Sequence, residues 1–377
     1  MRPFFLACTA LALSAALAPA AQAATGAVCV YKDPNYAGTP LCFSADKPTM
    51  DKGWDNKVSS VKVTAGYKVE LFDNANFGAG SVVLTADAPK LAKLDFDNKT
   101  SSVRVTAPTG SAKVTGSYYP DWEPAPLRIR DVNANDNLLY LFAARPVGGP
   151  PGTTGAVYFT MPGDGRGAAT HLVEDIAYAR TTQHRKIMLS VGGAGNGMSF
   201  PTRTKSQAFV NSIVSIYNQL GGFDGLDWNT FEGSQAPDTS EMIWISQQLK
   251  AKYPGFMISA PPAPWNSVDK TFCKAMLDAA VLDYCAPQYY DGPNLAEPDY
   301  VVGNVNEWVT LLGAEHVVVG FGINSAPNYM SRAQAIDTWN RVEAAHPTIR
   351  GGFDWETGTD ETQNWPFANG VAPLILH

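Results

Sequence analysis

Apolar and polar residues follow two different patterns along this chain. In the first third, short segments such as 60–64 and 68–72 alternate between apolar and polar positions, which predicts half-buried β-strands. From residue 113 onward, apolar segments rich in β-branched residues alternate with helical patterns. Over 206–220, for example, apolar residues recur along one helical face. The pattern therefore predicts an all-β part followed by an α/β part.

The α/β part, residues 113–377, has the length and element order of a (β/α)8 TIM barrel. Further helices are predicted over 239–253 and 332–345. A doubly wound open sheet is the alternative, but no glycine-rich nucleotide-binding loop follows the first predicted strand. The predicted barrel strands are 113–118, 138–143, 186–191, 222–228, 257–260, 282–288, 317–321 and 351–355.

The all-β part, residues 28–106, contains an internal repeat. Residues 28–64 and 67–106 each begin with a hairpin and end in a hexapeptide, Asp-Asn-Lys-Val-Ser-Ser at 55–60 and Asp-Asn-Lys-Thr-Ser-Ser at 97–102. A duplicated unit of short strands predicts two antiparallel Greek keys packed as a sandwich. The hexapeptides offer carboxylate, carbonyl and hydroxyl oxygens, which Ca2+ prefers. Hydrogen-bonded turns are the alternative for one copy, and two copies at equivalent positions favour calcium.

This part resembles the calcium-binding microbial βγ-crystallin domains, whose (N/D)(N/D)xx(S/T)S motif both hexapeptides match. The resemblance implies that each site also takes an acidic residue from the other repeat's hairpin, which is Asp73 for the first site. The equivalent position in the first hairpin is Lys32, with Asp33 beside it, and this departs from the family pattern. The implied metal ligands are the hydroxyls of Ser59 and Ser101, the backbone carbonyls of Lys57 and Lys99, and the carboxylates of Asp73 and Asp33.

The first residues have the features of a secretory signal peptide. Arg2 precedes a mostly apolar run over 4–18, and Ala21-Gln22-Ala23 is a small-x-small cleavage pattern. We therefore expect residues 1–23 to be removed on export and the protein to be extracellular. A membrane anchor is the alternative, although the run is short for a span and no later stretch is long and apolar enough. Residues 107–112 predict a linker.

Charge and cysteine content narrow the possible partners. The chain has 28 basic and 35 acidic residues, a formal net charge of −7 and no long basic run, which argues against nucleic acid or an anionic membrane surface as a partner.

Export would permit disulfides among Cys29, Cys42, Cys273 and Cys285. Of the three possible pairings, the local one is favoured, because each pair then falls in one domain. Buried free thiols are the alternative.

Aromatic and polar residues gather after the predicted barrel strands. In such barrels the chemistry sits at the carboxyl ends of the strands. Aromatic faces stack on sugar rings, and carboxylates suit glycoside hydrolysis. Each aromatic residue taken alone could serve packing, but their coincidence predicts a carbohydrate cleft. The candidates are Tyr118, Asp224, Asp227, Asn229, Glu232, Trp265, Gln288, Tyr290, Asp291 and Trp355.

Several of these segments resemble motifs of the family 18 glycoside hydrolases, the chitinases and endo-β-N-acetylglucosaminidases. Residues 186–193 match the strand-3 SxGG motif, and 223–227 match the start of the strand-4 DGxDxDxE motif. Residues 259–262, 288–291 and 351–355 match strands 5, 6 and 8. The resemblance implies a substrate of β-1,4-linked GlcNAc glycans, cut with help from the substrate's own N-acetyl group, and no cofactor for the barrel.

The strand-4 motif departs from the family pattern at two positions. Asn229 stands at the last aspartate, and Phe231 stands at the proton donor, with Glu232 one residue late. Side chains two apart share a face of a strand, so Glu232 points away from Asp227 unless a β-bulge follows Asn229.

Two functional interpretations therefore remain open, with a third that is weaker. In a glycosidase, Glu232 is the general acid and Asp227 and Asn229 complete the catalytic group. Tyr290 then positions the N-acetyl group, and Tyr118, Asp224, Gln288, Asp291 and Trp355 bind substrate. In a lectin, the same cleft holds a GlcNAc chain without cutting it. The third interpretation is a calcium-stabilised structural protein with an inert barrel.

Overall fold

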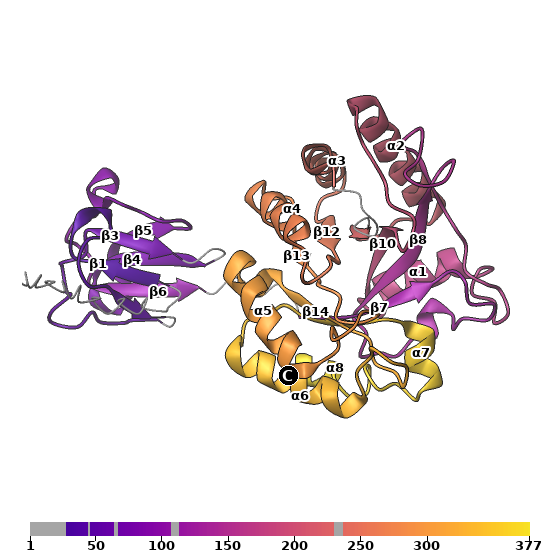
Figure 1. The fold of residues 1–377 in the computed structure, drawn as a ribbon. Helices are drawn as coiled ribbons and strands as arrows, with labels where there is room; N and C mark the ends of the chain where they lie inside the picture. Colours follow the sequence, from indigo (N-terminus) through magenta and orange to yellow (C-terminus); the bar gives the residue numbers. More distant parts are fainter. Residues whose placement is uncertain (1–27, 44–45, 64–66, 107–112, 230–236) are drawn as a thin grey trace, which may run out of the picture. The chain divides into compact units, whose positions relative to one another are not determined.

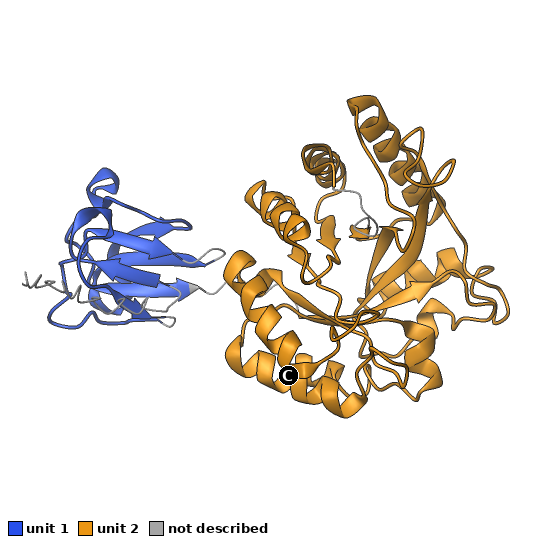
Figure 2. Ribbon diagram, in the orientation of Figure 1, with its two compact units in different colours: residues 1–109 blue, residues 110–377 orange. Residues whose placement is uncertain are grey.

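The computed structural model describes residues 28–43, 46–63, 67–106, 113–229 and 237–377, and it divides into two compact units. Unit 1 covers residues 1–109 and unit 2 covers residues 110–377 (Figure 2). The predicted signal peptide, the predicted linker, and Phe231 and Glu232 lie outside the described residues. No helix within the described ranges combines the length and apolar character that a membrane span needs.

Unit 1 contains two three-stranded antiparallel sheets, one from each sequence repeat. Their strand orders are β2-β1-β3 and β5-β4-β6, so the middle strand of each sheet is the first strand of its repeat. The first sheet contains β1 (Val28–Tyr31), β2 (Leu41–Phe43) and β3 (Ser60–Val63). The second contains β4 (Lys68–Asn74), β5 (Gly78–Leu84) and β6 (Ser102–Thr106).

In unit 1, one backbone segment of each repeat also pairs with the sheet of the other repeat. Lys47 from the first repeat pairs with Val103 on β6, and Ala88 from the second pairs with Val61 on β3. Both pairs exchange two backbone hydrogen bonds of 2.8–3.0 Å. This reciprocal exchange confirms the predicted pair of Greek keys, which enclose one shared apolar core.

The last serine of each hexapeptide fastens the hairpin of its own repeat. The hydroxyl of Ser60 donates to the carbonyl of Asp33 at 2.6 Å and accepts the backbone N–H of Tyr36 at 3.0 Å. Ser102 makes the same two bonds, to Asn74 and from Phe77, with the same distances. Ser60 and Ser102 therefore stabilise the hairpins. This role explains the second serine of each Ser-Ser pair without a metal ion.

Unit 2 is a parallel eight-stranded barrel. Its strand order is β13-β12-β11-β10-β8-β7-β15-β14, and isolated parallel bridges from Cys285 to Val317 and from Gln288 to Gly320 join the two ends (Figure 1). This closure rules out the doubly wound open sheet. The strands are β7 (Val114–Pro120), β8 (Leu138–Pro146), β10 (Lys186–Gly192), β11 (Gly225–Asn229), β12 (Met257–Ala260), β13 (Tyr284–Cys285), β14 (Val318–Phe321) and β15 (Gly351–Asp354).

The connections between the strands differ from the prediction in two places. Between β7 and β8, where every residue is described, a 3-10 turn (η4, Ile129–Asp131) stands in place of a helix. A short strand, β9 (Val157–Phe159), pairs antiparallel with the end of β8. The other connections are helical: α1 (Leu172–Thr181), α2 (Arg203–Gln219), α3 (Thr239–Lys252), α4 (Ser267–Asp278), α5 (Pro298–Leu312), α6 (Arg332–Ala345), α7 (Thr357–Thr362) and α8 (Ala372–Ile375).

The main apolar core of unit 2 lies between the strands and the surrounding helices. The apolar stripe of α2 supplies Phe209, Ile213 and Ile216 to it, and Trp228 of β11 stacks on Phe209 with ring centres 5.1 Å apart. Since alternate residues of a strand face opposite sides, Leu226 and Trp228 fill this outer core and leave the residues between them for the barrel interior.

Both disulfides have the predicted local pairing. Cys29 and Cys42 face each other on β1 and β2, and Cys273 of α4 is bonded to Cys285 of β13. The second disulfide therefore ties an outer helix to the barrel wall.

Candidate functional site

Asp227 lies in the barrel interior on β11, where its side chain is almost fully buried. Its Oδ2 accepts hydrogen bonds from the hydroxyls of Tyr118 and Ser190, both at 2.8 Å, and its Oδ1 accepts one from Ser259 at 2.6 Å. Burial raises the pKa of Asp227 to about 6, although the three hydroxyl donors oppose this shift. A carboxyl group with this pKa exchanges protons near neutral pH.

Asn229 ends the same strand and lies two residues nearer to the carboxyl end of the barrel. Its side chain is buried, and its Oδ1 has no hydrogen-bond partner among the described residues. Buried polar atoms without partners are rare in folded proteins and invite a ligand or water. Asn229 lines a cavity of about 690 Å3, whose wall also includes Trp122, Phe142, Arg145, Trp265, Asp291 and Trp355.

Aromatic rings form one wall of this cavity. Trp355 stacks on Tyr290 with an angle of 14° between the rings and 5.8 Å between their centres. Tyr118 lies beneath Trp355 at 5.3 Å, and Trp122 lies beside Trp355 at 5.7 Å. Trp122 and Trp265 are 51% and 65% exposed, which is unusual for tryptophan. The cavity therefore offers flat apolar faces of the kind that pack against sugar rings.

Polar side chains at the end of the sixth strand complete the wall. The hydroxyl of Tyr290 donates to Oε1 of Gln288 at 2.6 Å, and Nε2 of Gln288 donates to the carbonyl of Pro261 at 2.6 Å. Asp291 accepts a 2.8 Å hydrogen bond from the hydroxyl of Tyr329. The cavity lining includes five of the residues singled out from the sequence: Gln288, Tyr290, Asp291, Asn229 and Trp355.

Two predicted substrate-binding residues lie elsewhere. Asp224 precedes β11 at the amino end of the barrel, opposite the cavity, and it pairs with Arg180 at 3.0 Å. The sequence prediction had grouped Asp224 with Asp227 and Asn229 at the carboxyl end of this strand, but Asp224 precedes its first residue. Tyr118 is fully buried below the cavity wall, where it binds Asp227. The structure therefore assigns Tyr118 to the support of the site, not to its surface.

Arg145 is a cavity residue that the sequence analysis did not identify. It is the last residue but one of β8, and its guanidinium pairs with both carboxylate oxygens of Asp121 and donates to Thr160 at 2.7 Å. Asp121 and Arg145 come from different strands and have no motif to link them, so the sequence carries no signal for this pair. Ser190 and Ser259, in contrast, belong to the quoted strand motifs and were open to inference.

The candidate calcium ligands of unit 1 come from two hexapeptides that face each other. The backbone N–H of Asn56 donates to the carbonyl of Thr100, and that of Asn98 donates to Val58, both at 3.0 Å. Oδ1 of Asp97 is buried without a hydrogen-bond partner in the described part of the chain. That orphaned oxygen fits a cation. Within the same residues no three His, Cys, Asp or Glu side chains converge as a metal site. Serine hydroxyls and backbone carbonyls would have to supply the remaining ligands.

Comparison with known families decides where the barrel belongs. The sequence model for glycosyl hydrolases family 18 matches residues 114–347, which is more than half of the chain. The chain belongs to glycosyl hydrolase family 18. Asp227 and Asn229, which lie on β11, fall within the matched residues.

Relatives and solved structures agree with this family. A chitinase of Paenibacillus xylanexedens is 28% identical over 156 residues, which cover 38% of this chain and only 28% of that protein. A probable class II chitinase of Arthroderma benhamiae is 23% identical and matches over 51% of this chain and 77% of its own length. The structure of a family 18 chitinase from Chromobacterium violaceum has a TM-score of 0.61 at 21% identity and covers 73% of this chain and 88% of that one.

Unit 1 has matches of its own. The sequence model of peptidase inhibitor family I36 matches residues 16–85. A βγ-crystallin domain from Flavobacterium johnsoniae is 31% identical and covers 22% of this chain and 97% of that chain, with a TM-score of 0.21. The identity over nearly the whole of that domain makes unit 1 βγ-crystallin-like.

Proposed function

We propose that this family 18 protein is a secreted glycosidase that cuts β-1,4-linked GlcNAc glycans with retention of configuration. The observation that carries the proposal is the place of Asn229, which lines an aromatic-walled cavity two residues beyond the hydrogen-bonded Asp227 and whose buried Oδ1 has no partner among the described residues. The side-chain amide of Asn229 is a fitting partner for an acetamido group in the cavity, and the rings of Tyr290 and Trp355 in the cavity wall offer flat faces to the sugar that bears it.

In the proposed reaction, the carbonyl oxygen of the substrate's N-acetyl group attacks the anomeric carbon. The bond between that carbon and the leaving oxygen breaks, and a general acid gives the leaving oxygen a proton. Water then opens the oxazoline-type intermediate, and the acid, now a base, takes the proton back. Asn229 orients the N-acetyl group, while Asp227 supplies negative charge close to the positive intermediate.

Glu232 is the proposed general acid. Asp291 is the only carboxylate among the described residues that line the cavity, and its link to Tyr329 makes it a substrate ligand in this proposal. Glu232 is the third residue after Asn229, the last residue of β11. Substitution of Glu232 and of Asp291 therefore decides which residue is the general acid.

The test is product formation from chitotetraose and from a high-mannose N-glycan by wild type, Glu232→Gln and Asp291→Asn. We expect turnover by wild type, no measurable turnover by Glu232→Gln, and weakened substrate affinity for Asp291→Asn. Glu174→Gln on the outer helix α1 is the matched control and should leave turnover unchanged. Loss of turnover in Asp291→Asn with activity kept in Glu232→Gln would reassign the acid.

A lectin is the second candidate, and the neutral Asn229 at the position of a family aspartate favours it. Wild type that binds chitotetraose by calorimetry without any product would establish this alternative.

We also propose that unit 1 binds Ca2+ and that the protein acts outside the cell. The orphaned Asp97 oxygen between the facing hexapeptides supports the first point, with Ser59, Ser101, Lys57, Lys99, Asp73 and Asp33 as the proposed ligands. Two disulfides support the second, since such bonds persist in oxidising compartments. Detection of the protein in culture medium without residues 1–23 would test the export.

A further inference from the structure

The loop that follows β12, residues 261–266, supplies a continuous stretch of the cavity wall. Ala263, Pro264, Trp265 and Asn266 all line the cavity, and the indole of Trp265 is largely exposed there. Loops of this kind usually move, because few contacts hold them. Here the sequence Pro-Pro-Ala-Pro restricts the backbone at three positions out of four.

Every backbone hydrogen-bonding group of residues 261–264 has a partner. The three prolines have no N–H, so Ala263 carries the sole donor, and it binds Oδ2 of Asp269 at 3.0 Å. The carbonyls of Pro261 and Pro262 accept from the side chain and the backbone of Gln288. The carbonyl of Ala263 accepts from Asn266 within the loop. The barrel and the neighbouring helix thus satisfy the backbone of this loop, which constrains its conformation.

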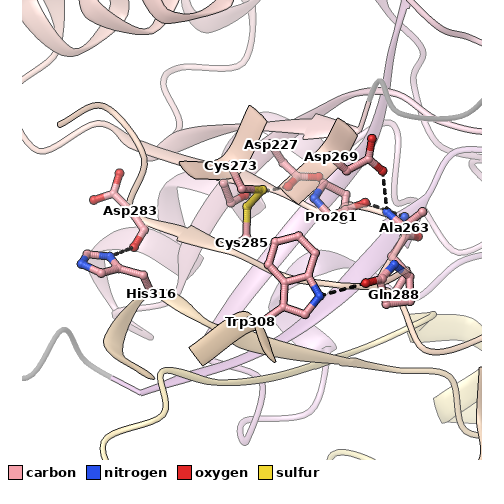
Figure 3. The surroundings of a disulfide bond; sticks show 12 residues. Asp227, Pro261, Ala263, Asp269, Cys273, Asp283, Cys285, Gln288, Trp308 and His316 are labelled. Carbon is pink, nitrogen blue, oxygen red and sulfur yellow. Dashed lines mark hydrogen bonds between the residues drawn. A yellow bond between two sulfur atoms is a disulfide. The ribbon is translucent and has the colours of Figure 1, made fainter. Parts of the chain in front are cut away.

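The remaining carbonyl, that of Pro264, is held by two buried side chains of α5. Nε1 of Trp308 donates to it at 3.1 Å, and Nδ2 of Asn304 donates at 3.3 Å. Trp308 has no exposed surface, and Asp269 on α4 is almost as deeply buried. Figure 3 shows Asp269, Trp308 and Gln288 reaching the loop from different sides. The loop is thus fixed from the outer helices as well as from the barrel strands.

The helix that carries Asp269 is itself tied to the barrel. Cys273 lies one helical turn beyond Asp269 on α4, and its disulfide to Cys285 joins that helix to β13 (Figure 3). Gln288, which follows on the same chain segment, holds Pro261. The carboxyl group of Asp269 therefore acts from a fixed position. Its burial raises its pKa to about 6, and the hydrogen bond from the Ala263 amide partly compensates for the cost of that burial.

We propose that Asp269 is a positioning residue that holds the 261–266 loop and so presents Trp265 to the glycan as a preformed sugar-binding face. Preformed surfaces bind more tightly, because little freedom remains to be lost on binding. Asp269 touches no part of the cavity itself, and its effect passes through the Ala263 amide. The glycan part of this inference rests on the proposed function, whereas the positioning part does not.

Hydrogen–deuterium exchange of the Ala263 amide tests the positioning without any ligand. We expect slow exchange in the wild-type full chain, fast exchange in Asp269→Ala, and slow exchange in Asp269→Asn, whose amide oxygen can still accept the bond. Asp278→Ala, on the same helix but paired only with Lys274, is the matched control and should exchange like wild type. Fast exchange in wild type would overturn the proposal, and so would slow exchange in Asp269→Ala.

Affinity for chitotetraose, measured by calorimetry and as KM, tests the role of the loop in binding. We expect Trp265→Ala to raise the dissociation constant roughly tenfold and Asp269→Ala to raise it about three- to tenfold, with kcat within about twofold of wild type. Asp269→Asn should restore wild-type affinity.

The two proposals fail in different ways. Wild type that binds no glycan contradicts the proposed function and leaves the exchange result to decide the positioning. Wild type that binds while Trp265→Ala binds equally well overturns the inference alone. If Asp269→Ala does not fold, Trp265→Ala and Asp269→Asn still decide the outcome.

Discussion

The hydroxyl of Tyr118 lies 2.8 Å from Oδ2 of Asp227 and donates a hydrogen bond to it. Tyr118 comes from the first barrel strand and Asp227 from the fourth, so the bond crosses the barrel interior. Tyr118 also packs face to face with Tyr140, with 4.6 Å between the ring centres. A carboxyl group buried among aromatic rings depends on such donors for its charged form, and this makes Asp227 sensitive to pH.

Asp227 should make the stability of unit 2 fall as the pH rises from about 4 to about 6. Its pKa is raised from 3.8 to about 6 in the folded protein, so the native state binds the proton more tightly than the unfolded chain does. The contribution is complete below the unfolded value and is lost as pH passes the folded value, by about 3 kcal/mol in total. Urea unfolding of wild type and Asp227→Asn across this range measures it.

The expected result is a difference between the two proteins that changes with pH between about 4 and 6 and is constant above this range. Asp278→Asn, at an exposed site, should follow wild type throughout. A pH-independent difference for Asp227→Asn would show that this carboxyl does not titrate in the folded protein.

Asn229→Asp should raise turnover of chitotetraose roughly ten- to a hundredfold. The new carboxylate would face the positive charge that develops on the substrate, and one well-placed electrostatic group is typically worth that much or more. The same change places a second acid beside the buried Asp227, so the melting temperature should drop. Initial rates and a melting curve check both effects, and unchanged rates would argue for the lectin interpretation.

Replacing Cys273 and Cys285 together by alanine should lower the unfolding free energy of unit 2 by about 2–4 kcal/mol. The disulfide closes a short loop that joins α4 to the barrel wall, and its loss frees that segment in the unfolded chain. Denaturant unfolding provides the measurement. The double alanine variant of Cys29 and Cys42, which lie in unit 1, is the control and should leave the barrel transition in place.

Calcium should raise the melting temperature of unit 1. A ligand present at a hundred times its dissociation constant stabilises the folded state by about 3 kcal/mol. Melting curves of the full chain in excess Ca2+ and in chelator measure the effect, which should vanish in the Ser59→Ala, Ser101→Ala double variant. Ser81→Ala, whose hydroxyl bonds only to Glu70, is the control. Identical curves in calcium and in chelator would refute the site.

The parts of the fold that could be predicted are those with a clear local sequence pattern. The barrel strands appear as β-branched apolar runs because both of their faces are buried, and the order of the eight agrees with the structure. The three residues of β9 are too few to form a pattern. Between β7 and β8, in contrast, Pro124, Pro126 and the Asn- and Asp-rich stretch 133–137 are signals against a helix, and the expected barrel repeat concealed them.

Site residues were predictable where a strand motif fixed their position. Asn229, Gln288 and Trp355 follow strands whose ends the motifs mark, and all three reach the cavity. Asp224 failed because the whole motif was assigned to the carboxyl end of the strand, whereas the five residues of β11, Gly225–Asn229, separate Asp224 from that end. The hold of Asp269 on Ala263 was beyond prediction, since nothing in sequence links a helical aspartate to a proline-rich loop.

Through the reciprocal pairing of Lys47 with Val103 and of Ala88 with Val61, a segment of the other repeat covers one edge strand of each sheet in unit 1. A single repeat cut out at the boundary would expose two unsatisfied strand edges and half of an apolar core. We expect such a fragment to associate with a second copy, so that two fragments form a dimer with the architecture of unit 1. Each repeat of unit 1 therefore depends on the other for its edge pairing and its core, so we expect the two repeats to fold and unfold together.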